Sequence, residues 1–270
     1  ISVFLGEELE AIVDSIVNDH DYTDRKRKSL RIGVDVLPAI PKDTTDRNRT
    51  SPVAFTGNKF EFRSLGSSQS IAGPNTILNT IMAEELEQFA EELEGAKDFS
   101  SALHELIKRV FTEHQRILFS GNGYDESWIA EAERRGLANL HNTAEALPAY
   151  ILPKNIQLMT SHGVYSKSEM MARHEIHMEK YCKVIGIEAG TLVDMVQHSI
   201  LCAASAYADK LCQSLAHKKA AGVACRTETA LAGTVSTLCD ELMDRTLALK
   251  TALQSEPNAP QEELVRYYHD

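Results

Sequence analysis

The chain has 270 residues, 43% of them hydrophobic and 25% charged, so it can bury the core of one or two domains. Its formal net charge of −11 argues against nucleic acid as a partner, because an acidic surface repels a phosphate backbone. No apolar run approaches the roughly 20 residues of a membrane span, and the start does not resemble a signal peptide, so we expect no membrane partner.

The cysteines and the first residue indicate the setting in which the chain occurs. Its five cysteines are far apart and form no C-x-x-C pair, so we expect reduced thiols in the core of a cytoplasmic protein. The chain begins at Ile1 rather than at methionine and continues directly into Ser2, Val3 and Phe4. We therefore expect it to be the C-terminal part of a longer protein.

The N-terminal segment has the pattern of a mixed α/β fold. Residues 7–17 are expected to form a helix, because apolar residues recur at helical spacing and the first turn is acidic. Residues 24–28 form a short basic loop, expected to be a solvated turn rather than a phosphate contact. Residues 30–40 alternate apolar and other side chains and stop at Pro38 and Pro41, which predicts a strand.

Segment 46–63, with the sequence D-R-N-R-T-S-P-V-A-F-T-G-N-K-F-E-F-R, has the most particular pattern of charged residues in the chain. Its last four residues, F-E-F-R, alternate apolar and charged. In a β-strand this alternation places both phenylalanines on one face and both Glu61 and Arg63 on the other. Arg47 and Arg49 add cationic side chains in the loop upstream.

A carboxylate and a guanidinium that project side by side favour a site for a metal ion beside an anionic substrate. Glu61 offers a hard oxygen ligand, and Arg63 offers a bidentate clamp for a carboxylate or a phosphate. The alternative is an exposed edge strand on which the two charges pair only with each other, a contact worth under about 1 kcal/mol. The first interpretation depends on Phe60 and Phe62 being covered: if they are exposed to water, the roles of Glu61 and Arg63 lose this support and only resemblance to a family remains.

After residue 74 almost the whole sequence is expected to be helical. Two capping patterns mark helix starts, Asn142 with Glu145 and Ser166 with Glu169. The expected helices cover residues 77–95, 103–118, 125–136, 142–148, 166–184, 188–220 and 226–254, with a loop at 152–163 and a final turn or helix at 258–268. The last two long helices carry Ala, Ser and Cys on their inner positions and are expected to pack closely as an antiparallel pair.

Three other patterns favour structural roles. His174 and His177 are three residues apart and could share a zinc ion, but no third ligand is evident nearby, so exposed or capping histidines are expected. Residues 121–124 (G-N-G-Y) lack the lysine and the strand-loop-helix context of a phosphate loop, so a turn is expected. The glutamates between 84 and 94 are expected to form a solvated acidic face.

The motif N-R-T-S-P followed by F-T-G-N-K-F-E-F-R resembles the corresponding region of the type III glutamine synthetases, as do the leading P-K-D-T-T-D-R and the trailing S-S-Q-S-I-A-G-P-N-T-I-L-N-T. More loosely, the resemblance extends over nearly the whole chain. It implies an α+β fold in which residues 1–95 are a remnant of the catalytic β-sheet domain. Residues 96–270 would form the helical C-terminal domain of type III enzymes, and most of the active site would precede Ile1.

The resemblance also implies roles for residues of the motif. Glu61 matches a glutamate ligand of the metal that bridges the phosphoryl groups, and Arg63 matches the arginine that contacts the substrate glutamate. Arg49 matches the arginine of the N-R motif, which is expected to be catalytic and to bind substrate near its carboxylate or the transferring phosphate. Type I enzymes carry another arginine for the nucleotide at the place where this chain has Ala54 and Phe55, and Arg47 is a candidate replacement.

By this resemblance the protein is a glutamine synthetase, a ligase that uses ATP and Mg²⁺ or Mn²⁺ to join ammonia to glutamate through γ-glutamyl phosphate. The resemblance also implies a cytoplasmic, ring-shaped homo-oligomer, a dodecamer. One carboxylate is too few for a catalytic divalent ion, so the chain alone is expected to be inactive. Three alternatives stay open: a γ-glutamyl-amine ligase, a guanidino kinase, and a helical assembly or regulatory module that has lost catalysis.

Overall fold

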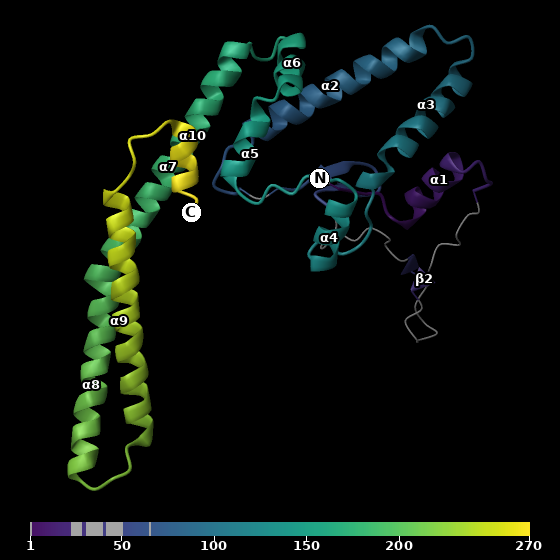
Figure 1. The fold of residues 1–270 in the computed structure, drawn as a ribbon. Coiled ribbons are helices and arrows are strands. Elements are labelled where there is room, and N and C mark those ends of the chain that lie inside the picture. The colour runs from purple at the N-terminus through teal and green to yellow at the C-terminus, as the bar shows by residue number, and fades with distance from the viewer. Residues whose placement is uncertain (1, 23–28, 31–39, 42–50, 65) are drawn as a thin grey trace. The chain divides into compact units, whose positions relative to one another are not determined.

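A computed structural model describes residues 2–22, 29–30, 40–41, 51–64 and 66–270 of the chain (Figure 1). The chain divides into two compact units, Ile1–Leu140 and His141–Asp270. The first unit combines short strands with helices, and the second is built from helices, which confirms the expected α+β fold with a mostly helical C-terminal region. The domain boundary expected at 95/96 stays a prediction, and the compact units divide at 140/141.

In its described residues, the first unit begins with a strand and a helix, continues with four short strands and ends with helices. The periodicity of residues 7–17 is confirmed by α1, which has these bounds. The described elements are β1 (Val3–Phe4), α1 (Glu7–Val17), β2 (Ser29–Leu30), β3 (Ile40–Pro41), β4 (Val53–Phe55), β5 (Phe60–Phe62), α2 (Ala72–Glu94), α3 (Phe99–His114), the 3-10 helix η1 (Gln115–Ile117) and α4 (Glu126–Arg134).

The single strand predicted over residues 30–40 is wrong. Its two ends form β2 and β3, which pair antiparallel with Leu30 opposite Ile40. Alternation of side chains fits either arrangement, and the sequence pattern alone does not show which strand a segment pairs with. Residues 31–39, and the basic segment 24–28, lie outside the described residues.

The larger sheet of the described residues has the strand order β1-β4-β5. Strand β1 runs parallel to β4, and β4 runs antiparallel to β5. A buried hydrogen-bond chain fixes the start of β4: the Ser2 hydroxyl donates to the Ser51 hydroxyl at 2.8 Å, which donates to the carbonyl of Phe119 at 3.1 Å. Ser51 is only 1% exposed, so these bonds replace water that the group has lost.

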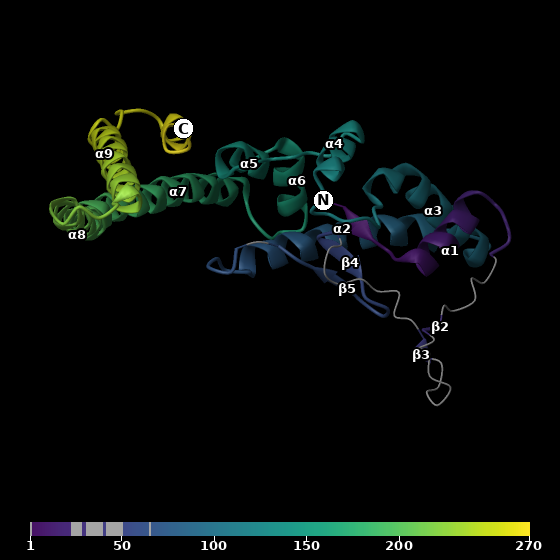
Figure 2. The same cartoon turned by 90° about the horizontal axis from the view of Figure 1, so that it is seen from below.

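Helices hold this sheet in place within the first unit. Helix α1 lies beside α3, and Val13 and Leu106 are their buried residues (Figure 2). The ring of Phe119 stacks on Trp128 of α4 with centroids 3.7 Å apart. Arg135 lies over the same Trp128 ring and donates to the carbonyl of Leu118 at 2.9 Å. The segment that contains Leu118 and Phe119 is therefore attached to α4 and its C-terminal end by ring stacking, by a cation–π contact and by a hydrogen bond.

The second unit packs α7 against shorter helices and a long hairpin. Its core cluster joins Met178 and Cys182 of α7 with Val265 of α10. None of the helices in the described parts of the chain combines the length and hydropathy that crossing a bilayer requires. The elements are α5 (Thr143–Tyr150), α6 (Pro153–Ser161), α7 (Lys167–Met195), the π-helix η2 (Val196–Ile200), α8 (Leu201–Ala220), α9 (Arg226–Gln254) and α10 (Gln261–Tyr267).

Several helix predictions for this unit are confirmed. Ser166 and Glu169 form the expected capping box, with the side chain of each bonded to the backbone N–H of the other. Asn142 caps α5 by accepting from the N–H of Glu145. Helices α8 and α9 pack side by side as the expected antiparallel hairpin, visible in Figure 1 as the green and yellow pair.

Three other helix boundaries are wrong. Residues 152–163, expected to be a loop, contain α6, because Pro153 occupies the first turn, where a missing N–H costs nothing. Pro148 does not end α5, which continues to Tyr150. The break expected between 184 and 188 is absent, and α7 passes through Gly186.

The cysteines also differ from expectation. Cys182 is buried and Cys202 and Cys212 are exposed, while Cys225 and Cys239 are intermediate. Burial raises the pKa of the Cys182 thiol, so this residue has the expected character of a small apolar group. The exposed pair lies on α8, which buries only one side in a two-helix hairpin, so a cysteine on the other side meets water.

Gly186 is explained by its neighbour rather than by a helix end. A Cβ at this position would lie 3.3 Å from Oη and 3.4 Å from Cε1 of Tyr268, whereas a Cβ at Gly190 of the same helix would meet nothing within 4 Å. The glycine therefore lets α10 approach α7 closely. A pattern-based analysis interprets such a glycine as a helix end, because the contact is invisible in the sequence.

A matched pair of substitutions tests this explanation. Gly190→Ala is expected to stabilise the chain by about 0.5–1 kcal/mol, the usual gain of alanine over glycine inside a helix. Gly186→Ala is expected to be at least about 1 kcal/mol less stable than Gly190→Ala, because its methyl group crowds Tyr268. Urea unfolding followed by far-ultraviolet circular dichroism measures both, and equal stabilisation by the two changes would contradict the explanation.

Candidate functional site

The charged residues of strand β5 lie together, as the sequence pattern predicts. Nη2 of Arg63 donates to Oε2 of Glu61 at 3.1 Å, and Nζ of Lys59 lies 3.7 Å from Oε1 of the same carboxylate. The Glu61 and Arg63 side chains are 29% and 32% exposed, so both keep an open side toward solvent. The strand therefore presents one carboxylate and one guanidinium in mutual contact.

The register of the sheet shows which face they occupy. Ala54 is opposite Glu61 across β4 and β5, and Phe4 is opposite Ala54 across β1 and β4. Paired residues point to the same side of a sheet, so Glu61 shares a face with Phe4 and Ala54, which are 5% and 1% exposed. The charged pair thus lies at the margin of the buried face.

The expectation that Phe60 and Phe62 are covered is wrong. Their side chains are 56% and 40% exposed, and Phe60 contacts the ring of Phe55 with centroids 5.3 Å apart. Strand β5 is an edge strand of the described sheet, and its apolar residues are on the face opposite Ala54. Alternation predicts correctly that the phenylalanines share a face, but it does not predict which face is buried.

The two other arginines of the motif, Arg47 and Arg49, lie outside the described residues, so their binding and catalytic roles stay predictions. The nearest described residue is Ser51, which the sequence analysis did not single out. Its buried hydroxyl links β1 to Phe119 and so fixes the end of the N-R-T-S-P motif. A serine-proline step directly before a strand is the signal that could have identified it. At the place of the type I arginine, where this chain has Ala54 and Phe55, Ala54 is 1% exposed and packs in the sheet.

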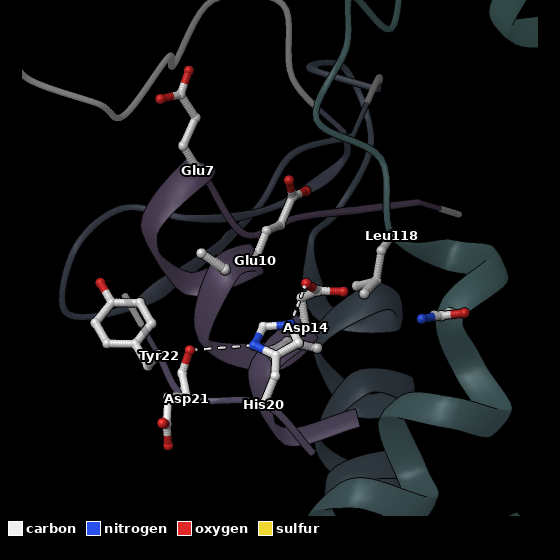
Figure 3. Close-up of a pocket in the computed structure, with 10 residues that line it drawn as sticks. Glu7, Glu10, Asp14, His20, Asp21, Tyr22 and Leu118 are labelled. Carbon is white, nitrogen blue, oxygen red and sulfur yellow. Dashed lines mark hydrogen bonds and ion pairs between the residues drawn. The ribbon is translucent and has the colours of Figure 1, made fainter. Parts of the chain in front are cut away.

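A second group of charged residues lines a groove of about 530 Å³ beside α1 (Figure 3). Glu7, Glu10 and Asp14 recur at helical spacing along one side of α1. Nε2 of His20 contacts Oδ2 of Asp14 at 2.9 Å, and this hydrogen bond raises the pKa of the imidazole. The groove is acidic, so it repels polyphosphate. An anionic ligand is expected to bind at Arg63 rather than in this groove.

The histidine pair of α7 does not form a zinc site among the described residues. His174 is 3% exposed in the same helix row as the buried Met170 and Met178, so the expectation of an exposed histidine is wrong for it. His177 packs edge-on against Tyr150 at 5.7 Å between centroids, and burial lowers the pKa of its imidazole. The buried His174, which shares a helix row with two methionines, is a packing feature. Residues 121–124 form the expected turn, ahead of the cap that Asp125 provides for α4.

Comparison with known proteins places these observations in a family. Residues 102–219 match the model of the glutamine synthetase C-terminal domain. The chain is 43% identical over 218 residues to the type-3 glutamine synthetase of Dictyostelium discoideum, an alignment that covers 80% of this chain and 30% of that protein. The chain belongs to the type III glutamine synthetase family.

Other relatives agree with this assignment. The chain is 35% identical over 226 residues to the glutamine synthetase of Bacteroides fragilis, covering 81% of this chain and 31% of that protein. It is also 35% identical over 225 residues to the glutamine synthetase of Butyrivibrio fibrisolvens. This type III chain therefore spans less than a third of the length of the curated relatives that it matches. The predicted resemblance to the type III glutamine synthetases is confirmed.

Proposed function

We propose that this chain forms part of an enzyme that joins ammonia to glutamate with consumption of ATP. The observation that carries the proposal is the 43% identity, over most of this chain, to a protein named type-3 glutamine synthetase. The placement of Glu61 and Arg63 in contact on one sheet face supports it. In this reaction the γ-carboxylate of glutamate attacks the γ-phosphorus of ATP and ADP leaves. Ammonia then adds to the acyl phosphate, phosphate departs with its bonding electrons, and the nitrogen loses a proton to give the amide.

The residues of this chain would bind and orient the anionic groups in these steps. Arg63 contacts Glu61 at 3.1 Å and remains 32% exposed, so part of its five-donor guanidinium is accessible to the carboxylate of a substrate glutamate. A fixed guanidinium binds a carboxylate with little reorganisation, which favours a substrate clamp on a strand over one on a loop. Arg49 would act near the transferring phosphate, and Arg47 near the nucleotide.

A divalent metal would neutralise the developing charge on the phosphoryl groups when bound. Glu61 fits such an ion as one oxygen ligand, because its carboxylate is accessible and lies at the edge of the buried face. Mg²⁺ and Mn²⁺ require about six ligands, and the two nearby cations, Lys59 and Arg63, disfavour a metal held by Glu61 alone. We infer that the remaining ligands come from sequence that the longer relatives have and this chain lacks.

The proposal also covers the localisation, the cofactors and the assembly of the enzyme. We infer a cytoplasmic enzyme that uses ATP with Mg²⁺ or Mn²⁺ and assembles as a ring-shaped homo-oligomer, as the family resemblance implies.

Glutamine formation by two proteins tests the proposed function. A protein that contains this chain and the rest of the length of its relatives is expected to convert glutamate, ATP and ammonia into glutamine, ADP and phosphate. The 270-residue chain alone is expected to form no detectable glutamine, because one carboxylate and one described arginine clamp do not make a metal site. Chromatographic measurement of the product formed from each acceptor decides the reaction: glutamine from ammonia, γ-glutamylmethylamide from methylamine, or phosphocreatine from creatine. Faster turnover of methylamine or creatine than of ammonia would reject the proposal.

A further inference from the structure

The main chain of Arg63 is bonded to Pro52 at the end of the β4–β5 ladder. Strand β5 ends at Phe62, and the backbone N–H of the next residue, Arg63, donates to the carbonyl of Pro52 at 2.7 Å. Opposite residues at such a position normally exchange two bonds, but proline has no N–H to donate in return. The place of the Arg63 backbone therefore depends on where the Pro52 carbonyl lies.

Pro52 is held by the residues on either side of it. It is exposed, so burial of its own ring does not fix it. Val53, which follows it, pairs with Val3 across β4 and β1. Ser51, which precedes it, is only 1% exposed and is bonded through its side chain. Of these two anchors, the one at Ser51 consists of side-chain bonds, which a substitution can remove.

The hydroxyl of Ser51 connects this corner of the sheet to a helix. It donates to the carbonyl of Phe119 at 3.1 Å. The ring of Phe119 in turn stacks on Trp128 of α4, with centroids 3.7 Å apart. A continuous path of bonded and stacked groups therefore runs from α4 through Ser51 and Pro52 to the backbone of Arg63.

Loss of the Ser51 hydroxyl would leave two groups without their present partner. The hydroxyl of Ser2, a residue that is 4% exposed, donates to it at 2.8 Å, and the carbonyl of Phe119 accepts from it. A buried polar group without a hydrogen bond is costly, so the segment is expected to move until these groups find other partners. Because Pro52 follows directly, this movement reaches the carbonyl that holds Arg63.

We propose that Ser51 is a positioning residue, whose hydroxyl aligns Arg63 with the substrate glutamate through Pro52. The inference rests on the proposed function, because it requires that Arg63 contacts the substrate. A displacement of about 1 Å in a group that orients a substrate can slow a reaction on the order of 100-fold, so a clamp needs a fixed backbone as well as the right side chain. The alternative is that Ser51 only stabilises the first unit, in which case its loss has no preference for one substrate.

Initial rates of the complete enzyme, with glutamate and ATP varied separately, test this role. Ser51→Ala is expected to raise the KM for glutamate at least about 5-fold and the KM for ATP less than about 2-fold, because a displaced group weakens the ligand that it contacts. Ser2→Ala removes the donor to Ser51 but keeps the bond to Phe119. A smaller rise in the KM for glutamate, about 2- to 4-fold, is therefore expected for it.

Thr80→Val is the matched control. It removes another buried hydroxyl of the first unit, one that donates to the carbonyl of Thr76 within α2 at 2.8 Å. Neither KM is expected to change more than about 2-fold, because this bond stays inside one helix and the carbonyl keeps its intrahelical partner. Thermal unfolding of each variant shows whether it is folded at the assay temperature.

Combination with Arg63→Ala distinguishes positioning from stability. If Ser51 acts through Arg63, adding Ser51→Ala to Arg63→Ala raises the KM for glutamate less than about 2-fold further, whereas the effects of independent residues multiply. If Ser51→Ala does not fold, the same combination is made with Ser2→Ala. Equal rises in both KM values, or effects that multiply, overturn the positioning role in an enzyme that forms glutamine. An unchanged enzyme that forms no glutamine overturns the proposed function instead.

Discussion

Replacing Glu61 with glutamine in the complete enzyme is expected to lower the turnover number for glutamine formation by roughly 100-fold or more. Glutamine keeps the size of the side chain and still accepts a hydrogen bond from Arg63, so the strand pairing of β5 is preserved. The charge that binds a divalent ion is lost, so the Mg²⁺ concentration for half-maximal activity is expected to rise as well. Steady-state rates measured across a Mg²⁺ titration check both effects.

Glu92→Gln is a matched control for this change. Glu92 of α2 also pairs with an arginine, Arg109 of α3, in the same compact unit, but this pair joins two helices rather than lying on the sheet. Activity is expected to stay within about 2-fold of the original, because exposed ion pairs contribute little to stability. Near-normal turnover of Glu61→Gln at ordinary Mg²⁺ would reject the ligand role and favour a purely structural pair with Arg63.

The local features of this fold are predictable where a short stretch of sequence determines them. Helix α1 follows from its apolar spacing, and the start of α7 follows from Ser166 and Glu169, since both depend on residues within a few positions of each other. The α8–α9 hairpin follows from small residues at helical spacing on two long segments. The contact between Glu61 and Arg63 also follows from a local rule, the two-residue period of a strand.

Features that depend on distant parts of the chain were not predictable in the same way. A helix break is expected between residues 184 and 188, but Gly186 lies inside α7, where the ring of Tyr268, more than 80 residues later, is what requires the glycine. The pairing of β2 with β3 and the exposure of Phe60 depend on which strands are neighbours, and alternation within one strand does not contain that information. Ser51 was missed because its partners, Ser2 and Phe119, come from the two ends of the first unit.

The candidate site also contains one local feature that the sequence predicts and one long-range feature that it does not. The relation between Glu61 and Arg63 is local and was predicted, but the side of the sheet that they share with Phe4 and Ala54 is known only from the register of three strands. This register gives the pair a defined side of the sheet, but the exposed Phe60 and Phe62 remove the structural support that the first interpretation required, so the roles of Glu61 and Arg63 rest on the family resemblance. Charges at the margin of a buried face are held in a fixed direction and partly desolvated, which a pair on an open edge is not. The face of the sheet that carries Phe60 is not covered by other described residues, because the side chain of Phe60 is exposed.

Replacing Arg63 with alanine or lysine separates substrate binding from nucleotide binding. Arg63→Ala removes a charge-assisted bond worth about 1.5–3 kcal/mol, so the KM for glutamate is expected to rise roughly 10- to 150-fold. Arg63→Lys keeps the charge but loses the bidentate fork, and an intermediate rise is expected. The KM for ATP is expected to change less than about 3-fold, because the proposal assigns the nucleotide to other residues.

Initial rates with each substrate varied at saturation of the other measure both constants. Lys59→Ala is the neighbouring control: it removes a cation that also lies within 4 Å of Glu61, but its side chain is 64% exposed and is assigned no substrate contact. Its KM for glutamate is expected to stay within about 3-fold of the original value. Equal increases in both KM values for Arg63→Ala would mean that the arginine only maintains the position of Glu61. An effect on glutamate alone, graded from lysine to alanine, requires a guanidinium that contacts the substrate.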